Sequence, residues 1–194
     1  PGVLGVELVD DLAHQLLDQI LQGDEPGLSA RAVYLEHHMN YPFGVTLVQL
    51  EVDASTGGHR ILRFFTSSEC GRMINPQTTE GQVIGAAAQG IGGALFEEFL
   101  YDDEGQPLST LLMDYLLPTS TDVPTVELYL TEDAPTRDNP LGAKGLGEVG
   151  LIAVGAAIAA AIDDALQATD GIRRLPATPE AIWTLAQRGA VKPG

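Results

Sequence analysis

The sequence has little cysteine and few basic residues, and both shortages narrow the classes of protein that it can be. The single cysteine, Cys70, excludes an internal disulfide and any zinc site built from several cysteines. Ten lysines and arginines against 27 aspartates and glutamates leave a formal charge of −17. Nucleic acids and acidic membrane surfaces bind to basic faces, so neither is expected as a partner. A reducing, cytoplasmic compartment is the expectation that follows from the cysteine count.

Long hydrophobic runs are also missing. The longest run, Leu151 to Ile162, is too short to cross a bilayer and predicts a buried helix. The first residues lack the charged and hydrophobic regions of a signal peptide. Apolar residues still make up 44% of the 194 residues, which is enough to build a globular core. These features indicate a globular domain rather than a membrane or disordered segment.

Hydrophobic periodicity predicts an α+β domain in which antiparallel strands pack with helices. The strands are expected over residues 45–52, 59–67 and 126–131, and the first two form a hairpin around a DASTGG loop. The DDEGQP segment at 102–107 predicts an acidic turn. Thr178 before Pro179 predicts a helix N-terminus. The expected helices cover residues 7–22, 78 or 79 to 99, 149–168 and 179–188.

The helix expected near residues 78–99 is rich in glycine, although each interior glycine costs about 1 kcal/mol relative to alanine. Gly81, Gly85, Ala88 and Gly92 fall on one helical face. Such a face allows another backbone or a flat ligand to come close. Tight packing within the protein is the simpler explanation of this pattern, and a ligand surface is the alternative.

Gln82 has two interpretations on the same helix. In the pattern Thr79-x-x-Gln82 its side chain would reach back to the helix N-terminus as part of a capping box. Alternatively, Gln82 lies where the free N–H groups of a first turn could hold an anion. On the sequence pattern alone, capping is favoured.

A second glycine-rich segment, GAKGLGEVG at 142–150, leads directly into the expected alanine-rich helix. Gly145, Gly147 and Gly150 match the G-x-G-x-x-G pattern of dinucleotide-binding sites. No buried strand precedes the pattern, however, and too little sequence follows it for a second βα unit. What remains is a loop that presents one carboxylate, Glu148, for a chemical role or simply to complement the helix dipole. The histidines show no metal-ligand spacing, so no side chain is expected to ligate a metal.

Together these segments resemble the C-terminal part of the molybdenum-binding large subunit of the xanthine dehydrogenase, aldehyde oxidase and carbon monoxide dehydrogenase family. The resemblance rests on four segments in order: YPFGVTLVQLEVD (41–53), ECGRMINP (69–76), EGQVIGAAAQGIGGALFEE (80–98) and GAKGLGEVG (142–150). It implies that residues 1–194 are one molybdopterin cofactor-binding domain of the aldehyde oxidase/xanthine dehydrogenase type. We expect this domain to be a fragment, or a split-subunit piece, of a longer large subunit.

The resemblance also implies roles for particular residues. The position beside the molybdenum falls on Glu148, which would act as general base in an oxidoreductase that hydroxylates aldehydes or N-heterocycles or oxidises carbon monoxide. The position near the pterin falls on Gln82, and the loop from Lys144 through Gly145 and Leu146 to Gly147 would line the cofactor site. Other segments of the subunit would complete this site and bind the small-molecule substrate.

Iron–sulfur and FAD groups are implied for partner domains or chains, because one cysteine cannot ligate a cluster. Two other functions stay open at this point. The chain could be a noncatalytic assembly module that packs through its glycine-rich helix. It could also be a nucleotide-binding domain, although no buried strand precedes the G-x-G-x-x-G pattern as such a domain requires.

Overall fold

The computed structural model describes residues 38–190, which form the α+β fold expected from the sequence. Three strands make one sheet in the order β1–β2–β3. The helix expected over residues 7–22 lies outside the described residues. In chain order the elements are β1 (Phe43–Val52), β2 (His59–Glu69), α2 (Pro76–Leu95), β3 (Val126–Thr131), α3 (Val149–Ile152), α4 (Val154–Ala165) and α5 (Pro179–Ala190).

β1 and β2 form the predicted antiparallel hairpin, with Phe43 opposite Glu69 at its open end. Asp53 ties the turn, because its carboxylate accepts hydrogen bonds from the backbone and hydroxyl of Ser55, at 2.9 and 2.6 Å. These bonds hold the pKa of Asp53 below its usual value. Gly57 has a φ of +76°, and a β-carbon there would lie 1.8 Å from the carbonyl oxygen of Pro179. The start of α5 therefore packs closely against this turn.

β3 pairs with β2 in parallel, so the sheet is mixed. The prediction of antiparallel strands is right for the hairpin and wrong for this third strand. The reason is α2, which carries the chain back along the sheet before β3 begins. A parallel pair needs such a crossover connection, and it is usually helical.

The helix boundaries differ from the predictions at both ends of α2. Its N-cap is Asn75, whose side chain accepts a hydrogen bond from the Thr78 amide at 3.1 Å, and Pro76 occupies the first turn. Gln82 therefore lies in the second turn, and the capping box predicted for Thr79 and Gln82 does not form. The helix ends at Leu95 rather than residue 99.

The last two predicted helices have different outcomes. The helix predicted over residues 149–168 is divided at Ala153 into α3 and α4. The N-terminus of α5 is confirmed, because the Ala181 amide donates a hydrogen bond to the Thr178 hydroxyl at 3.2 Å. Within residues 38–190, no helix has the length and apolar content that crossing a membrane requires.

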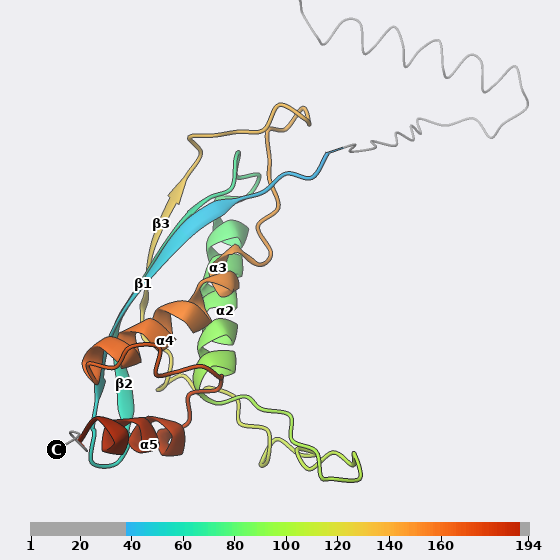
Figure 1. Cartoon of the computed structure of the whole chain (residues 1–194). Helices are drawn as coiled ribbons and strands as arrows, with labels where there is room; N and C mark the ends of the chain where they lie inside the picture. Colours follow the sequence, from blue (N-terminus) through green and yellow to red (C-terminus); the bar gives the residue numbers. More distant parts are fainter. Residues whose placement is uncertain (1–37, 191–194) are drawn as a thin grey trace, which may run out of the picture. The chain divides into compact units, whose positions relative to one another are not determined.

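The core lies between one face of the sheet and the helices. In Figure 1, α2, α3 and α4 lie along this face, and α5 lies beside the β1–β2 turn. The buried apolar side chains come from β2, α2, α4, α5 and the segment before α5. They include Ile61, Phe64, Ala87, Ile91, Ala94, Leu95, Val154, Ile158, Ile162, Ala177 and Ile182.

The glycines of α2 fall into two groups. A β-carbon on Gly90 would lie 2.7 Å from the Val154 β-carbon, so Gly90 lets α4 approach α2. Gly92 is also close-packed, against Glu97 and Pro118. A β-carbon on Gly81 or Gly85 would meet no atom within 4 Å. The close packing expected for this stripe is therefore present at Gly92 and absent at Gly81 and Gly85.

This difference predicts opposite effects of the same substitution at two positions of one helix. Gly90→Ala should lower the free energy of unfolding by about 1–3 kcal/mol, because the new methyl group overlaps Val154. Gly85→Ala should raise it by up to about 1 kcal/mol, because alanine is the better helix former and space is open. Urea unfolding of the 194-residue chain measures both values. Two shifts of the same sign would contradict this description of α2.

Candidate functional site

The two glycine-rich segments singled out in the sequence meet in the structure. The Gln82 side-chain amide, on the second turn of α2, donates a hydrogen bond to the Gly147 carbonyl oxygen at 3.3 Å. These residues are 65 positions apart in the sequence. The contact places the second turn of α2 beside the loop that leads into α3. Gln82 and the loop 144–147, which the resemblance implies for the cofactor site, therefore lie side by side.

The loop that carries Gly147 is attached to the end of β2 by backbone hydrogen bonds. The Lys144 amide donates to the Cys70 carbonyl oxygen, and the Arg72 amide donates to the Gly142 carbonyl oxygen, both at 2.9 Å. Gly71 has a φ of +67°, and a β-carbon there would lie 2.3 Å from the Gly142 oxygen. A glycine is therefore needed at position 71 for the two segments to come this close.

A buried ion pair fixes the same attachment. The Lys144 ammonium lies 2.7 Å from a Glu69 carboxylate oxygen, and the two side chains are only 11% and 3% exposed. The Glu69 carboxylate also accepts hydrogen bonds from the Gly71 amide at 2.7 Å and the Ala134 amide at 3.1 Å. Burial alone would raise the pKa of Glu69, but the bonds from Lys144 and the two amides outweigh it and hold this pKa below its usual value.

Glu148 stands at the N-terminus of α3 with an exposed side chain. Its carboxylate caps no helix N–H, and it has no hydrogen-bond or ion-pair partner among residues 38–190. α3 has only four residues, so the helix dipole gives little reason for a carboxylate there. Glu148 lines an open pocket of about 390 Å³ between α2 and the α3–α4 segment. The other lining residues are Gly90, Gly93, Ala94, Leu151, Ile152, Gly155 and Leu175.

The surface around this pair of segments lacks side chains at several positions. A β-carbon on Gly81, Gly85, Gly93 or Gly147 would meet no atom within 4 Å. The three helical glycines each cost about 1 kcal/mol relative to alanine. No contact within the described residues explains why glycine, rather than alanine, stands at these three positions. The open glycines therefore leave room for a group that comes from outside these residues.

The glycine loop offers hydrogen-bond donors as well as space. The amides of Gly145, Leu146 and Gly147 donate to no acceptor within residues 38–190. Three consecutive unpaired backbone N–H groups can bind the oxygen atoms of an anionic or polar ligand. Lys144 differs from its neighbours, because its amide bonds to Cys70 and its ammonium to Glu69. Lys144 holds the loop in place, and the three residues after it remain free to contact a ligand.

The single cysteine directly follows β2, where the glycine loop is attached. Cys70 is buried, and burial raises the pKa of its thiol. Among residues 38–190, no group of three or more His, Cys, Asp and Glu side chains is arranged to hold a metal ion. The groups that the candidate site offers to a ligand are backbone donors, one amide side chain and one carboxylate.

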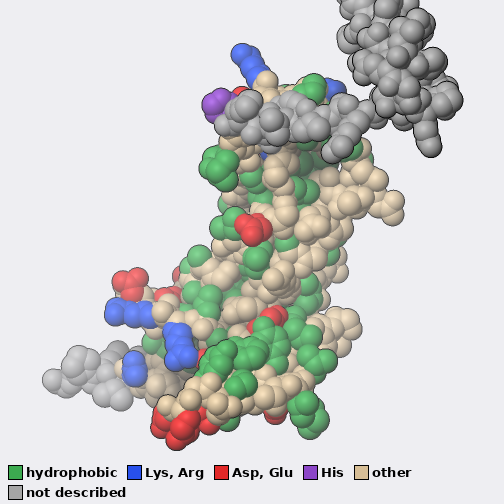
Figure 2. Space-filling model, turned by 90° about the vertical axis from the view of Figure 1, so that its right-hand side faces the viewer, with side chains coloured by type: hydrophobic (Ala, Val, Ile, Leu, Met, Phe, Trp, Pro, Cys, Tyr) green, Lys and Arg blue, Asp and Glu red, His purple; other side chains and the backbone are tan. Residues whose placement is uncertain are grey.

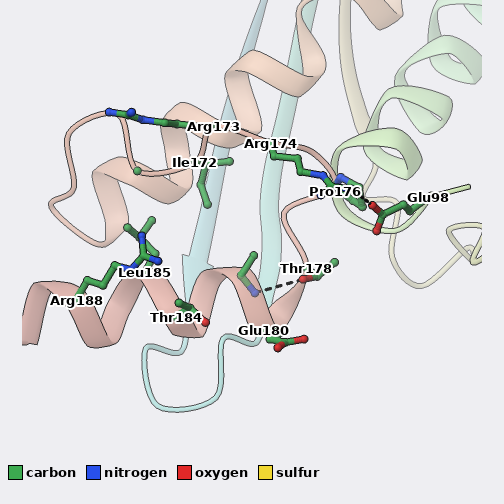
Figure 3. A pocket seen from close by; sticks show the side chains of 12 residues that line it. Glu98, Ile172, Arg173, Arg174, Pro176, Thr178, Glu180, Thr184, Leu185 and Arg188 are labelled. Carbon is green, nitrogen blue, oxygen red and sulfur yellow. Dashed lines mark hydrogen bonds and ion pairs between the residues drawn. The ribbon is translucent and has the colours of Figure 1, made fainter. Parts of the chain in front are cut away.

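A larger pocket, of about 500 Å³, lies between α5 and the segment 171–176 and contains none of these residues. Figure 3 shows Arg174 pointing to Glu98 across one side of this pocket, where the two side chains form an ion pair. The Arg173 guanidinium donates a hydrogen bond to the Asp170 carbonyl oxygen at 2.8 Å. Arg173 and Arg174 therefore serve local contacts, and this pocket is separate from the predicted site.

Sequence reasoning missed two features of the site. The sequence predicts no role for Glu69, because its partner Lys144 lies 75 positions away and neither residue has a distinctive neighbour pattern. The sequence predicts Leu151 and Ile152, beside Glu148, within a continuous buried helix, and Ile152 is instead 74% exposed. Both side chains line the pocket, and they lie just before the helix break at Ala153. The apolar run 151–162 contains no residue that indicates a helix break at Ala153, so the sequence could not predict that Ile152 is exposed.

The G-x-G-x-x-G pattern does not form a dinucleotide site. β3 ends at Thr131, and the loop 132–148 separates it from α3. The pattern therefore does not occupy a strand-to-helix turn, which dinucleotide binding requires.

Comparisons with known proteins agree on one family. A family model described as "Molybdopterin cofactor-binding domain" matches residues 6–124, a range that includes Gln82 and the open glycines Gly81 and Gly85. The chain is 64% identical over 166 residues to the 6-hydroxypseudooxynicotine dehydrogenase complex subunit gamma of Paenarthrobacter nicotinovorans, covering 84% of this chain.

Solved structures give the same picture. A Cu,Mo-carbon monoxide dehydrogenase superposes with a TM-score of 0.78 at 32% identity over 88% of this chain. Quinoline 2-oxidoreductase from Pseudomonas putida 86 gives a TM-score of 0.65 at 45% identity over 70% of this chain. The chain spans about one fifth of the relatives it matches, with 21% of the gamma subunit and 22% of the dehydrogenase chain covered.

The buried ion pair predicts a large effect from a small change. Lys144→Met should lower the free energy of unfolding by about 3–5 kcal/mol, because it leaves the Glu69 carboxylate buried without its counter-charge. Arg60→Met is the matched control, since Arg60 pairs with Glu51 at 2.9 Å where both side chains are more than half exposed. That change should cost about 1 kcal/mol or less. Similar losses from the two variants would contradict the assigned role of Lys144.

The pH dependence of stability follows from the same pair. The pKa of Glu69 is lowered in the folded chain, so its contribution is complete above the usual value of 4.5 and is lost as the pH falls through the lowered folded value. Unfolding measured between pH 6 and about pH 3 should show this loss in the wild type and a smaller one in Lys144→Met.

Proposed function

Because the chain belongs to the molybdopterin cofactor-binding domain family, we propose that it forms one wall of a molybdenum–pterin site in the large subunit of an oxidoreductase. The substrate class is that of small aldehydes, N-heterocycles or carbon monoxide. The carbon monoxide and quinoline enzymes among the structural relatives support this range. The rest of the large subunit completes the site, and partner domains or chains carry iron–sulfur and FAD groups.

One observation carries the proposal. Gln82 and the loop at Gly147 meet by a hydrogen bond, and the surface around them is left open by glycines that the described chain does not need for its own packing. A planar ring system requires this kind of flat surface without side chains. A pterin also requires hydrogen-bond partners along its edges, which an amide side chain and free backbone N–H groups supply.

The donor set fits a metal that arrives already bound to an organic cofactor. Residues 38–190 offer no cluster of metal-ligating side chains, so this wall would hold the pterin part rather than ligate the metal. The amides of Gly145, Leu146 and Gly147 would donate hydrogen bonds to cofactor oxygens. Gln82 keeps its carbonyl oxygen and one N–H free after donating to Gly147. Lys144 would contribute by holding the loop through Glu69.

When bound, the molybdenum–pterin group would supply the two-electron redox chemistry of the reaction. Glu148 would supply the acid–base step, because its carboxylate oxygens have no partner within the described chain and line the open pocket beside α2. A general base must reach the proton that it accepts without first breaking a strong ion pair. Leu151, Ile152 and Leu175 form an apolar side of the same pocket. Once the pocket is covered, these side chains would exclude water from around the carboxylate.

The assembly-module alternative uses the same open face of α2. A helix from another part of the subunit could pack against Gly81, Gly85 and Gly93 without any cofactor. The two alternatives differ in what Gln82 does, because helix packing gives no reason for a polar side chain that contacts the glycine loop. The following substitution separates them.

In the complete enzyme, Gln82→Ala should reduce the molybdopterin content and leave the fold nearly unchanged. The side chain is exposed and caps no helix, so its removal costs the chain only the contact with Gly147. Gln77→Ala on an exposed position of the same helix is the control and should retain full cofactor content. Pterin fluorescence after oxidation and the melting temperature are measured on one preparation. Full cofactor content in the Gln82 variant would favour the assembly module.

Glu148→Gln keeps the size and hydrogen-bonding reach of the side chain and removes the proton acceptor. Turnover of the complete enzyme should fall by about 10²–10⁴-fold, the range attributed to general acid–base catalysis, with molybdenum content retained. Glu80→Gln changes another exposed carboxylate, outside this pocket, and should leave turnover unchanged. Near-normal turnover of a fully loaded Glu148 variant would remove this residue from the mechanism.

A further inference from the structure

We propose that residues 99–117, here called the arm, form a docking surface for the rest of the large subunit. The arm leaves the end of α2 and extends away from the sheet and helices (Figure 1). It contains none of the residues assigned to the cofactor site. Its partner is a surface with an apolar centre and a basic rim.

Large apolar side chains cover the arm on its outside. Met113 is 85% exposed and Leu112 is 75% exposed. Figure 2 shows hydrophobic side chains gathered at the lower end of the molecule, with acidic side chains beside them. The exposed apolar residues of the arm are Phe99, Leu100, Tyr101, Leu108, Leu111, Leu112, Met113, Leu116 and Leu117. An exposed patch of this extent marks an interaction site in a stable protein.

Hydrogen bonds within the described residues hold the arm in shape, although its large apolar side chains are exposed. The Leu108 amide donates to the Leu100 carbonyl oxygen at 2.7 Å, and Tyr101 and Pro107 form an antiparallel bridge. The predicted acidic turn closes this hairpin, with the Asp102 carboxylate accepting from the Glu104 and Gln106 amides.

Two further bonds tie the arm to Glu97 and Glu98, which follow the end of α2. The Tyr115 hydroxyl donates to the Glu97 carboxylate at 2.6 Å, and the Ser109 hydroxyl donates to the Glu98 carbonyl oxygen at 3.1 Å. The hydrogen bonds therefore hold the arm in a shape that presents leucine and methionine side chains outward. A segment that faced only water would gain nothing from this arrangement.

Charge and chain length identify the partner. Residues 99–117 include three aspartates and one glutamate and no lysine or arginine, so a complementary surface carries basic residues around its apolar centre. The whole sequence is also acidic, with 27 Asp and Glu against 10 Lys and Arg, so a second copy of the chain would be repelled from this patch. Relatives are about five times as long as the matched segment, since the chain covers 21–22% of them. The remainder of the large subunit therefore offers far more surface than this domain.

The inference rests on the proposed function in one respect, namely that a large subunit supplies the partner surface. The test uses the complete enzyme and measures amide hydrogen exchange in the arm. The amides of Leu111, Leu112 and Met113 donate to no acceptor within residues 38–190, so they exchange rapidly unless another surface covers them. Protection of these amides by about tenfold or more relative to an unstructured peptide is the expected result for the wild type.

Two variants make the test specific to the apolar side chains. Leu112→Glu combined with Met113→Glu should remove the protection, while exchange in β2 stays unchanged. Thr110→Glu adds a charge at an exposed polar position of the same arm and should keep the protection. Rapid exchange of residues 111–113 in the wild-type enzyme would overturn the proposal, and so would equal effects of the two variants.

The same preparations separate this proposal from two others. If the double variant halves the molar mass measured by light scattering, the arm joins two copies of the subunit and the proposal is wrong. Molybdopterin content is measured in parallel. A protected arm in an enzyme without pterin would uphold the docking surface and overturn the proposed function. An unprotected arm in an enzyme with full pterin would do the reverse.

Discussion

The buried ion pair between Glu69 and Lys144 is the interaction on which the rest of the site depends. A carboxylate 3% exposed is tolerated inside a protein only when its oxygens have partners, and this one has the Lys144 ammonium and two backbone amides. Those donors come from three separate segments: the end of β2, the loop after β3 and the glycine loop. One side chain thereby helps to fix where the glycine loop stands relative to the end of β2. Together with the two backbone hydrogen bonds to the same loop, it positions the Gly147 carbonyl oxygen that Gln82 contacts.

The glycines of α2 are of two kinds: some are needed for packing within the chain, and others are not. Gly90 serves the chain itself, because α4 could not approach α2 with a side chain there. Gly81, Gly85 and Gly93 do not, and they weaken the helix without any contact in return. Natural sequences depart from local preference mainly at functional sites. Of the open glycines, Gly93 lines the same pocket as the unpaired Glu148 carboxylate, and the loop with free amides contacts α2 through Gln82. This is an arrangement expected of a cofactor wall.

Much of the fold could be predicted from the sequence because the hairpin, β3 and α5 carry local signals. The DASTGG turn, alternating strands and the Thr178 cap depend on neighbouring residues only. The start of α2 was predicted too late because two threonines looked like better caps than Asn75, which in fact accepts the capping bond. The parallel pairing of β3 and the break at Ala153 depend on tertiary packing and could not be predicted. Gln82 and Glu148 were found through the resemblance to a family, whereas Glu69 became visible only when the structure brought Lys144 to it.

The central claim is that the open face of α2, with Gln82 and the glycine loop beside it, is one wall of the molybdenum–pterin site. Anomalous X-ray diffraction from crystals of the complete enzyme, recorded at the molybdenum absorption edge, tests it most directly. We expect a molybdenum peak on the side of α2 that carries Gly85, with the Glu148 carboxylate nearer to it than any other carboxylate of residues 38–190. A peak beside the arginine-lined pocket of α5, or on the far face of the sheet, would show that α2 is not a wall of the molybdenum–pterin site.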